Sequence, residues 1–267
     1  MKLVNVDRQT EATFLRCLHD EEPDDPRVIG MRRSAYEEAL RRGLRAKVLI
    51  LDSGEVAGLC QCMPIEETHL LGHGLMAVLC IWVHGYEHHI GNRQGNGYGR
   101  YILDSIEDEA RGDGFAGVAA WGMDFPYWNP VSFYEHMGYE RADKVGEAVL
   151  VWKSFEESAE PPRFRRARRR PPVRPDRVSV AVFNSGWCTS MCSQCVTARE
   201  AIEGLDEIVD YLEVGTADRR VLDEWGIWDL LLVEGELHRP NEPPCTSDVL
   251  RDDIVNLARD KGLAVPD

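Results

Sequence analysis

The 267-residue chain is long enough to favour two domains, and its 43% hydrophobic and 29% charged residues are typical of a soluble globular protein. Its formal net charge of -15 argues against general nucleic-acid binding, because contacts to phosphates require cations. No apolar run reaches the roughly 18 residues of a membrane span, and the N-terminus lacks a secretory signal, so we expect a cytoplasmic protein whose cysteines are thiols or ligands.

The clearest secondary-structure pattern lies between residues 75 and 122. The run "LMAVLCIWVH" predicts a strand that is buried on both faces. After a loop, apolar residues recur at helical spacing, and "FAGVAAWG" then predicts a second buried strand. The order is therefore strand, glycine-rich turn, helix, strand. The predicted buried side of the helix consists of Ile102, Leu103, Ile106 and Ala110.

Three glycines, Gly95, Gly97 and Gly99, precede this helix. They allow the backbone to pass close to a bulky anion, and N–H groups at a helix N-terminus favour phosphate. The same glycines also fit part of a dinucleotide-binding fingerprint. That alternative is less favoured, because the turn lies in mid-domain rather than after the first strand.

Two segments in the right order resemble motifs of the GNAT N-acetyltransferases. "QGNGYG" (94–99) fits that family's Q/R-x-x-G-x-G/A acyl-CoA pyrophosphate loop, and "NPVSFYEHMGYER" (129–141) resembles its later segment, an Asn followed by a helix. The resemblance covers residues 1–155. It implies an α/β fold whose mixed sheet splays between two central strands, with acetyl-CoA in the gap and an acceptor amine attacking the thioester directly.

The resemblance also implies roles for individual residues. The backbone of Ile81, Trp82 and Val83 would pair with the pantetheine, and Asn129 would approach the cofactor. Tyr134 would protonate the departing thiolate as a phenol held near the sulfur; the alternative is a plain core aromatic. The pyrophosphate would lie against the loop and the residue that follows it, namely Gln94, Gly95, Asn96, Gly97, Tyr98, Gly99 and Arg100.

The sequence departs from the GNAT pattern in two places. The connection "HGYEHHIGNR" (84–93) is longer than usual. The strand before it lacks the carboxylate that many members use as the general base. Candidates for removing the amine proton are Glu87 and His84, together with Glu66 and Glu67.

Histidines gather in and around this connection. Clustered neutral imidazoles are ligands for zinc, copper or nickel, but a polar loop lining the acceptor cleft has the same composition. The sequence leaves both interpretations open for His69, His73, His84, His88 and His89.

Residues 156–177 combine proline pairs with an arginine cluster and few apolar residues. Such a segment predicts an exposed, semi-extended linker between two domains. It is a docking strip for RNA or an acidic partner, or it lies against acidic faces of this same protein.

Residues 178–267 predict the element order β-α-β-α-β-β-α, with Ser247 as the N-cap of the last helix. This order resembles the small thioredoxin-like α/β fold, with Trp187 and Cys188 in the place of its Trp-Cys pair. A GNAT domain followed by a domain of this size is similar to the YoaP-type acetyltransferases. The place of the fold's cis-proline is taken here by Trp228-Asp229, which makes general disulfide exchange doubtful.

Cys188, Cys192 and Cys195 have the spacing C-x3-C-x2-C. This is also the iron–sulfur spacing of radical S-adenosylmethionine enzymes, but the stretch after Cys195 is too short for their barrel. On a helix the three sulfurs fall on one face. They predict a site for a thiophilic metal, with Cys245 or water as a fourth ligand, or redox thiols; buried small side chains are the third interpretation.

The leading hypothesis is an acetyl-CoA-dependent N-acetyltransferase with an accessory thiol- or metal-binding domain. Its acceptor would be an amine of a small molecule or of a protein, and a homodimer is left open. The alternatives are a non-catalytic acyl-CoA-binding sensor of a metal or metalloid, and a thiol-redox protein.

Overall fold

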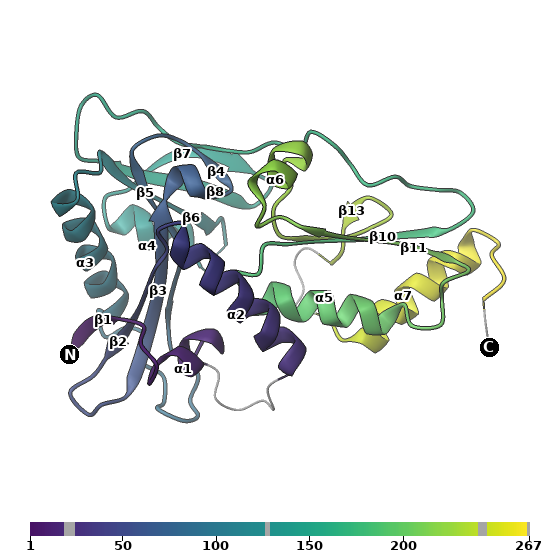
Figure 1. Cartoon of the computed structure of the whole chain (residues 1–267), viewed down its shortest axis with the longest axis horizontal. Helices are drawn as coiled ribbons and strands as arrows, with labels where there is room; N and C mark the ends of the chain where they lie inside the picture. The colour runs from purple at the N-terminus through teal and green to yellow at the C-terminus, as the bar shows by residue number, and fades with distance from the viewer. Residues whose placement is uncertain (19–24, 126–128, 240–244, 266–267) are drawn as a thin grey trace. The chain divides into compact units, whose positions relative to one another are not determined.

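A computed structural model describes residues 1–18, 25–125, 129–239 and 245–265 (Figure 1). By its contacts the chain divides into two units, Met1–Pro23 with Glu37–Arg165, and Asp24–Tyr36 with Arg166–Asp267. The first part of helix α2 therefore belongs to the second unit, which the sequence did not indicate. None of the described helices is long and apolar enough to cross a membrane.

The first unit is built on a seven-stranded sheet with the order β1-β2-β3-β5-β6-β8-β7 (Figure 1). Neighbouring strands are antiparallel except for the central pair β5–β6, which is parallel. The elements are β1 Lys2–Asn5, α1 Glu11–Leu15, α2 Pro26–Arg41, β2 Arg45–Ile50, β3 Val56–Pro64, the 3-10 helix η1 Ile65–Glu67, β4 Leu70–Leu71, β5 Leu75–Val83, α3 Tyr98–Gly112, β6 Gly117–Met123, α4 Val131–His136, β7 Glu140–Val145, β8 Ala148–Ser154 and β9 Arg163–Phe164.

The central strands separate part-way along their length. β5 and β6 pair only from Leu75–Gly117 to Val78–Ala120. The next residue of β5, Leu79, is skipped in the register with β3, which is the mark of a β-bulge. The expected splayed mixed sheet is therefore present. The expectation that this strand is buried on both faces is wrong for residues 80–82, which are half-exposed because no strand covers them on the β6 side.

Helix α3 packs across β3, β5 and β6. Its predicted buried side is confirmed, since Ile102, Leu103, Ile106 and Ala110 are all at most 1% exposed. The helix joins a core that also contains Tyr134 and Tyr139. This packing fixes where the N-terminus of α3 lies relative to the separated strands.

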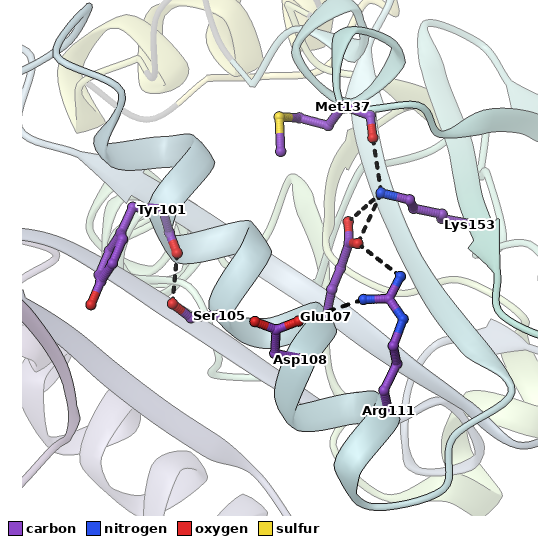
Figure 2. Close-up of polar contacts among 7 residues, drawn as sticks. All are labelled: Tyr101, Ser105, Glu107, Asp108, Arg111, Met137 and Lys153. Atoms are coloured by element: carbon purple, nitrogen blue, oxygen red, sulfur yellow. Dashed lines mark hydrogen bonds and ion pairs between the residues drawn. The ribbon is translucent and has the colours of Figure 1, made fainter.

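An ion pair with a buried carboxylate ties α3 to strand β8 (Figure 2). The Glu107 side chain is 4% exposed and accepts two hydrogen bonds from Lys153 Nζ of β8, at 2.8 and 3.0 Å. Lys153 Nζ also donates to the carbonyl of Met137, just past α4, at 3.1 Å. Arg111, one turn along α3, reaches Glu107 at 3.4 Å. One lysine therefore links α3, β8 and the end of α4.

The second unit has a four-stranded sheet with the order β11-β10-β12-β13. β10 is parallel to β11 and antiparallel to β12, and β13 is antiparallel to β12. Helices α5 and α7 lie on one side of the sheet and α6 on the other (Figure 1). The elements are β10 Val178–Asn184, α5 Thr189–Ala201, β11 Val209–Gly215, α6 Arg219–Trp225, β12 Leu230–Val233, β13 Glu236–Leu237 and α7 Ser247–Asp260.

The predicted N-cap of α7 is displaced by one residue. Thr246 has extended backbone angles, and its side chain accepts a hydrogen bond from the Val249 amide. Ser247 is instead the first helical residue. A threonine and a serine in succession offer the same chemistry, so the sequence alone did not distinguish them.

The arginine-rich segment 156–177 is mostly exposed, as predicted, but it is anchored at several points. The amides of Arg168 and Arg169 donate to the Trp225 carbonyl at 2.8 and 3.3 Å. The Arg169 guanidinium lies 4.4 Å from the Trp225 ring centroid and pairs with Glu224. These contacts favour the interpretation that the strip lies against the protein's own acidic residues.

Candidate functional site

The glycine-rich loop leads directly into α3. Gly95 and Gly97 have φ angles of +76° and +78°, a region that favours glycine, and Gly97 is the N-cap of the helix without any side-chain cap. Within the described part of the chain, the amides of Tyr98, Gly99 and Arg100 donate no hydrogen bond, and the first turn holds no acidic residue. Their N–H groups and the helix dipole form a binding place for an anion.

Gln94 joins the two ends of the long connection (84–93) that precedes this loop. Its side-chain amide donates to the Val83 carbonyl at 3.1 Å, and the Arg93 amide donates to the His84 carbonyl at 2.8 Å. A Cβ on Gly85 would lie 2.5 Å from Gln94 Nε2, so a larger residue there would displace the Gln94 side chain. Gln94 therefore holds the loop at the end of β5 with its side chain. Asn96 braces the next turn by donating to the carbonyls of Arg93 and Gln94.

Two of the candidate bases lie within the connection. His84 is buried, and its Nδ1 donates to the Gly91 carbonyl at 3.1 Å. Because a carbonyl only accepts, the proton sits on Nδ1 and Nε2 keeps its lone pair. Glu87 is exposed in the same connection. Glu66 and Glu67 are engaged elsewhere, Glu66 by the Gly74 amide and Glu67 by Arg42, so they hold local structure instead.

Of the two interpretations of the histidines, a metal site or a polar loop, the described residues give no support to the metal site. No group of three His, Cys, Asp or Glu residues in the described part of the chain is placed to hold a metal ion. His88 stacks on Tyr86 with ring centroids 5.0 Å apart, and His84 meets both rings edge-on. His69 is buried, and burial holds its pKa well below the usual 6.5. The cluster is therefore an aromatic packing unit at the end of β5.

Tyr134 and Asn129 join a chain of hydrogen bonds across the separated strands. The Tyr134 hydroxyl donates to Asn129 Oδ1 at 3.5 Å, and Asn129 Nδ2 donates to the Trp121 carbonyl at 2.9 Å. Trp121 Nε1 then donates to the Leu79 carbonyl of β5 at 2.9 Å. Burial, with smaller effects of the Cys80 and Cys60 thiols, raises the pKa of Tyr134 far above 10. The phenol is therefore a protonated donor close to β5.

Sequence reasoning missed Trp121. Its side chain spans the gap between β5 and β6 just beyond their last paired residues. The sequence shows only a tryptophan near the end of a predicted strand. That pattern does not reveal which carbonyl the indole will reach.

The three clustered cysteines do not converge on a site. Cys188 is the half-buried N-cap of α5, whereas Cys192 and Cys195 are fully buried. Cys192 packs with Val28 and Val196, and Cys195 belongs to the main core of the second unit. Burial raises the pKa of Cys195 to about 12. Two of the three thiols are therefore core side chains, and no group of metal ligands is found around them among the described residues.

Asp229 organises the turn before α5. Its carboxylate accepts from the Ser185 amide at 2.6 Å, from the Ser185 hydroxyl at 3.0 Å and from Trp187 Nε1. Trp187 in turn stacks on Trp228 with ring centroids 5.0 Å apart. Burial nevertheless dominates and raises the pKa of Asp229 to about 7. Its role in the structure is to hold the backbone that leads to Cys188.

This raised pKa predicts a pH-dependent stability. The folded protein holds the Asp229 proton more tightly than the unfolded chain, so the stabilisation is complete below pH 4 and is lost as the pH rises through about 7. We expect the unfolding free energy to gain about 2 kcal/mol between pH 8 and pH 5 relative to an Asp229→Asn variant. Urea unfolding followed by tryptophan fluorescence measures this. An equal pH response in both proteins would contradict it, and Asp252→Asn, an exposed change on α7, is the control.

Comparison with known proteins gives matches among solved structures. No protein-family model matches the chain, and no curated protein does. A ribosomal-protein-alanine N-acetyltransferase from Brucella melitensis is 18% identical to this chain, with a TM-score of 0.44. The match covers 58% of this chain and 100% of that protein's chain. Spermidine N-acetyltransferase from Vibrio cholerae, in complex with CoA and spermine, is 15% identical, with a TM-score of 0.43. The match covers 57% of this chain and 94% of that chain.

A GNAT-family acetyltransferase from Brucella melitensis in complex with acetyl-CoA is 16% identical and covers 58% of this chain and 88% of its own, with a TM-score of 0.39. At these identities and TM-scores, no activity passes from these proteins to this chain. The functional proposal therefore depends on the residues and the geometry of the site.

Proposed function

We propose that residues 1–155 bind acetyl-CoA and transfer its acetyl group to an amine. The observation that carries the proposal is the separation of β5 from β6 after Val78 and Ala120, beside the uncapped N-terminus of α3. Residues 79–83 then form a strand edge without a partner strand on the β6 side. An extended pantetheine fits such an edge, because it offers amides that pair with strand backbone.

The pyrophosphate, the pantetheine and the thioester of acetyl-CoA each have a matching element in this proposal. Residues 95–100 hold the pyrophosphate through backbone N–H groups, and residues 81–83 pair with the pantetheine. Asn129 is held by the Trp121 carbonyl, and its Oδ1 orients the Tyr134 hydroxyl. As the thiolate leaves, the Tyr134 hydroxyl turns its single proton from Asn129 Oδ1 to the sulfur.

The amine must lose a proton to attack the thioester carbonyl. His84 is the preferred base, because Nε2 keeps its lone pair while Nδ1 is fixed on the Gly91 carbonyl. Glu87 is the alternative, and its exposure would suit a base that acts through water. The acceptor is a small-molecule amine or a protein amine, and the expected location is the cytoplasm.

The second half is proposed to be a thioredoxin-like domain, residues 178–267, joined by the linker 156–177. The support is its strand order and the antiparallel third strand. With Cys192 and Cys195 buried in apolar clusters, dithiol exchange with a protein disulfide is disfavoured.

The proposal is tested by calorimetry with CoA and by an amine screen that measures free CoA released from acetyl-CoA. We expect binding of one CoA per chain and amine-dependent release. Absence of CoA binding by the folded protein would contradict the proposal.

Two glycines of α3 supply a sharper test. Gly97→Ala places a Cβ at φ +78°, which costs about 1–2 kcal/mol. The free loop can relieve this strain by leaving the binding conformation, and CoA must then restore it, so we expect CoA affinity to fall about tenfold. Gly112→Ala changes the last residue of the helix, where φ is not positive and no atom lies within 4 Å. That control should leave affinity unchanged and raise the unfolding free energy by about 0.5 kcal/mol. Equal affinities in the two variants would exclude the loop from CoA binding.

A further inference from the structure

A cysteine, a histidine and an aspartate meet at the start of α7, away from the three clustered cysteines. Cys245 Sγ lies 3.8 Å from His238 Nδ1, and His238 Nε2 lies 2.9 Å from Asp253 Oδ2. Cys245 forms no disulfide and is half-buried. All three residues belong to the second unit. The arrangement is that of a nucleophile, a base and a group that orients the base.

Asp253 determines which nitrogen of the His238 imidazole carries the proton. A carboxylate accepts, so His238 carries its proton on Nε2, and its Nδ1 lone pair faces the Cys245 thiol. Arg239 holds the same carboxylate with two hydrogen bonds, at 2.8 and 3.1 Å. These bonds, with that from His238, keep the pKa of Asp253 below its usual 3.8. The carboxylate therefore stays charged and retains its role as an acceptor.

The imidazole is held rigidly. The His238 side chain is only 9% exposed, and its backbone amide donates to the Leu231 carbonyl at 3.0 Å. Asp253 lies on α7, whose neighbouring residues Leu250 and Ile254 are fully buried in the core of the unit. The base and its partner are thus fixed to the sheet and to a packed helix. Such rigidity is what a catalytic pair requires.

The start of α7 supplies donors for a developing negative charge. Cys245 immediately precedes the N-cap Thr246 of this 14-residue helix. Thr246 satisfies the Val249 and Leu250 amides. In the described part of the chain, the amides of Ser247 and Asp248 donate no hydrogen bond. Free amides at a helix N-terminus stabilise an oxyanion.

We propose that Cys245 is a nucleophile that accepts an acyl group from activated esters and thioesters. His238 Nδ1 takes the thiol proton, and the sulfur attacks the acyl carbonyl carbon. The tetrahedral intermediate then collapses, the bond from carbon to the leaving oxygen or sulfur breaks, and the leaving group takes the proton from His238. The products are S-acyl-Cys245 and an alcohol or thiol. This reaction does not depend on the proposed acetyl transfer by the first unit.

The test uses the full-length protein and 4-nitrophenyl acetate. We expect a burst of nitrophenolate and a peptide containing Cys245 that carries one acetyl group by mass spectrometry. Cys245→Ser should remove the burst. His238→Gln, which can still donate to Asp253 but is no base, should slow acylation by about 100-fold. Asp253→Asn should slow it about tenfold, whereas the exposed neighbour Asp252→Asn should not change it.

Two comparisons make the result decisive. Cys188, the other half-buried thiol of this unit, should react at least tenfold more slowly in the same sample. Acylation by acetyl-CoA at Cys245 should persist in Tyr134→Phe, which separates this site from the first unit. Equal labelling of Cys188 and Cys245, or an unchanged rate in folded His238→Gln, would overturn the proposal.

Discussion

Replacement of Tyr134 by phenylalanine is expected to lower kcat by about 100-fold and to leave CoA affinity within about twofold. The hydroxyl is the only group removed, and its hydrogen bond to Asn129 Oδ1 is long, at 3.5 Å. The ring remains in the core, where it is 1% exposed. The variant therefore slows the step in which the thiolate leaves and leaves CoA binding almost unchanged. Steady-state kinetics with acetyl-CoA, together with calorimetry of CoA, measures both quantities.

Tyr139 provides the matched control. It is also buried, at 4% exposed, and its ring centroid lies 5.8 Å from that of Tyr134. Tyr139→Phe removes a phenol from the same core and should leave kcat near that of the unchanged protein. If both variants lost activity equally, the effect would be one of packing, and Tyr134 would not be the acid.

The pH dependence provides a second check on Tyr134. Because burial raises its pKa far above 10, the phenol stays protonated through the usual assay range. We therefore expect that ionisation of Tyr134 causes no fall in kcat below pH 9. Any fall in that range should be the same in Tyr134→Phe. A fall that Tyr134→Phe abolishes would indicate a phenol that ionises, which is incompatible with the buried position.

Local patterns were sufficient for much of the fold. Apolar runs located β5 and β6, and helical spacing gave the buried side of α3, because these signals depend on residues close in sequence. The first part of α2, residues 26–36, shows the limit of such patterns. Their helical character is local, but their packing with the second unit depends on contacts to residues more than 140 positions away, such as Met31 with Asn184.

The cysteine cluster shows a different limit. Helical spacing correctly placed Cys192 and Cys195 on one side of α5. Spacing does not say whether that side faces solvent or the core, and here it faces the core. The Cys245 triad was equally hidden, because its members come from a strand end, a loop and a helix. The sequence indicated Cys245 only as a possible fourth ligand of a metal.

Replacement of Lys153 by methionine is expected to lower the unfolding free energy by about 3 kcal/mol. The Glu107 carboxylate, 4% exposed, would lose both hydrogen bonds from Lys153 and keep the 3.4 Å contact with Arg111 (Figure 2). Removing the closer partner of a buried charge costs about this much. Chemical unfolding gives the value, and Asp108→Asn, on the same helix with a side chain 84% exposed, is the control that should change little.

The double variant Glu107→Met with Lys153→Met separates the charge from the packing. Removing both charges leaves two apolar side chains of similar length, so it should be more stable than Lys153→Met alone. A double variant as unstable as the sum of the two single changes would contradict the ion-pair explanation. Lys153 also donates to the Met137 carbonyl, just past the helix that carries Tyr134. The double variant should therefore regain stability but not full kcat, since that carbonyl still lacks its donor and the end of α4 is less firmly placed.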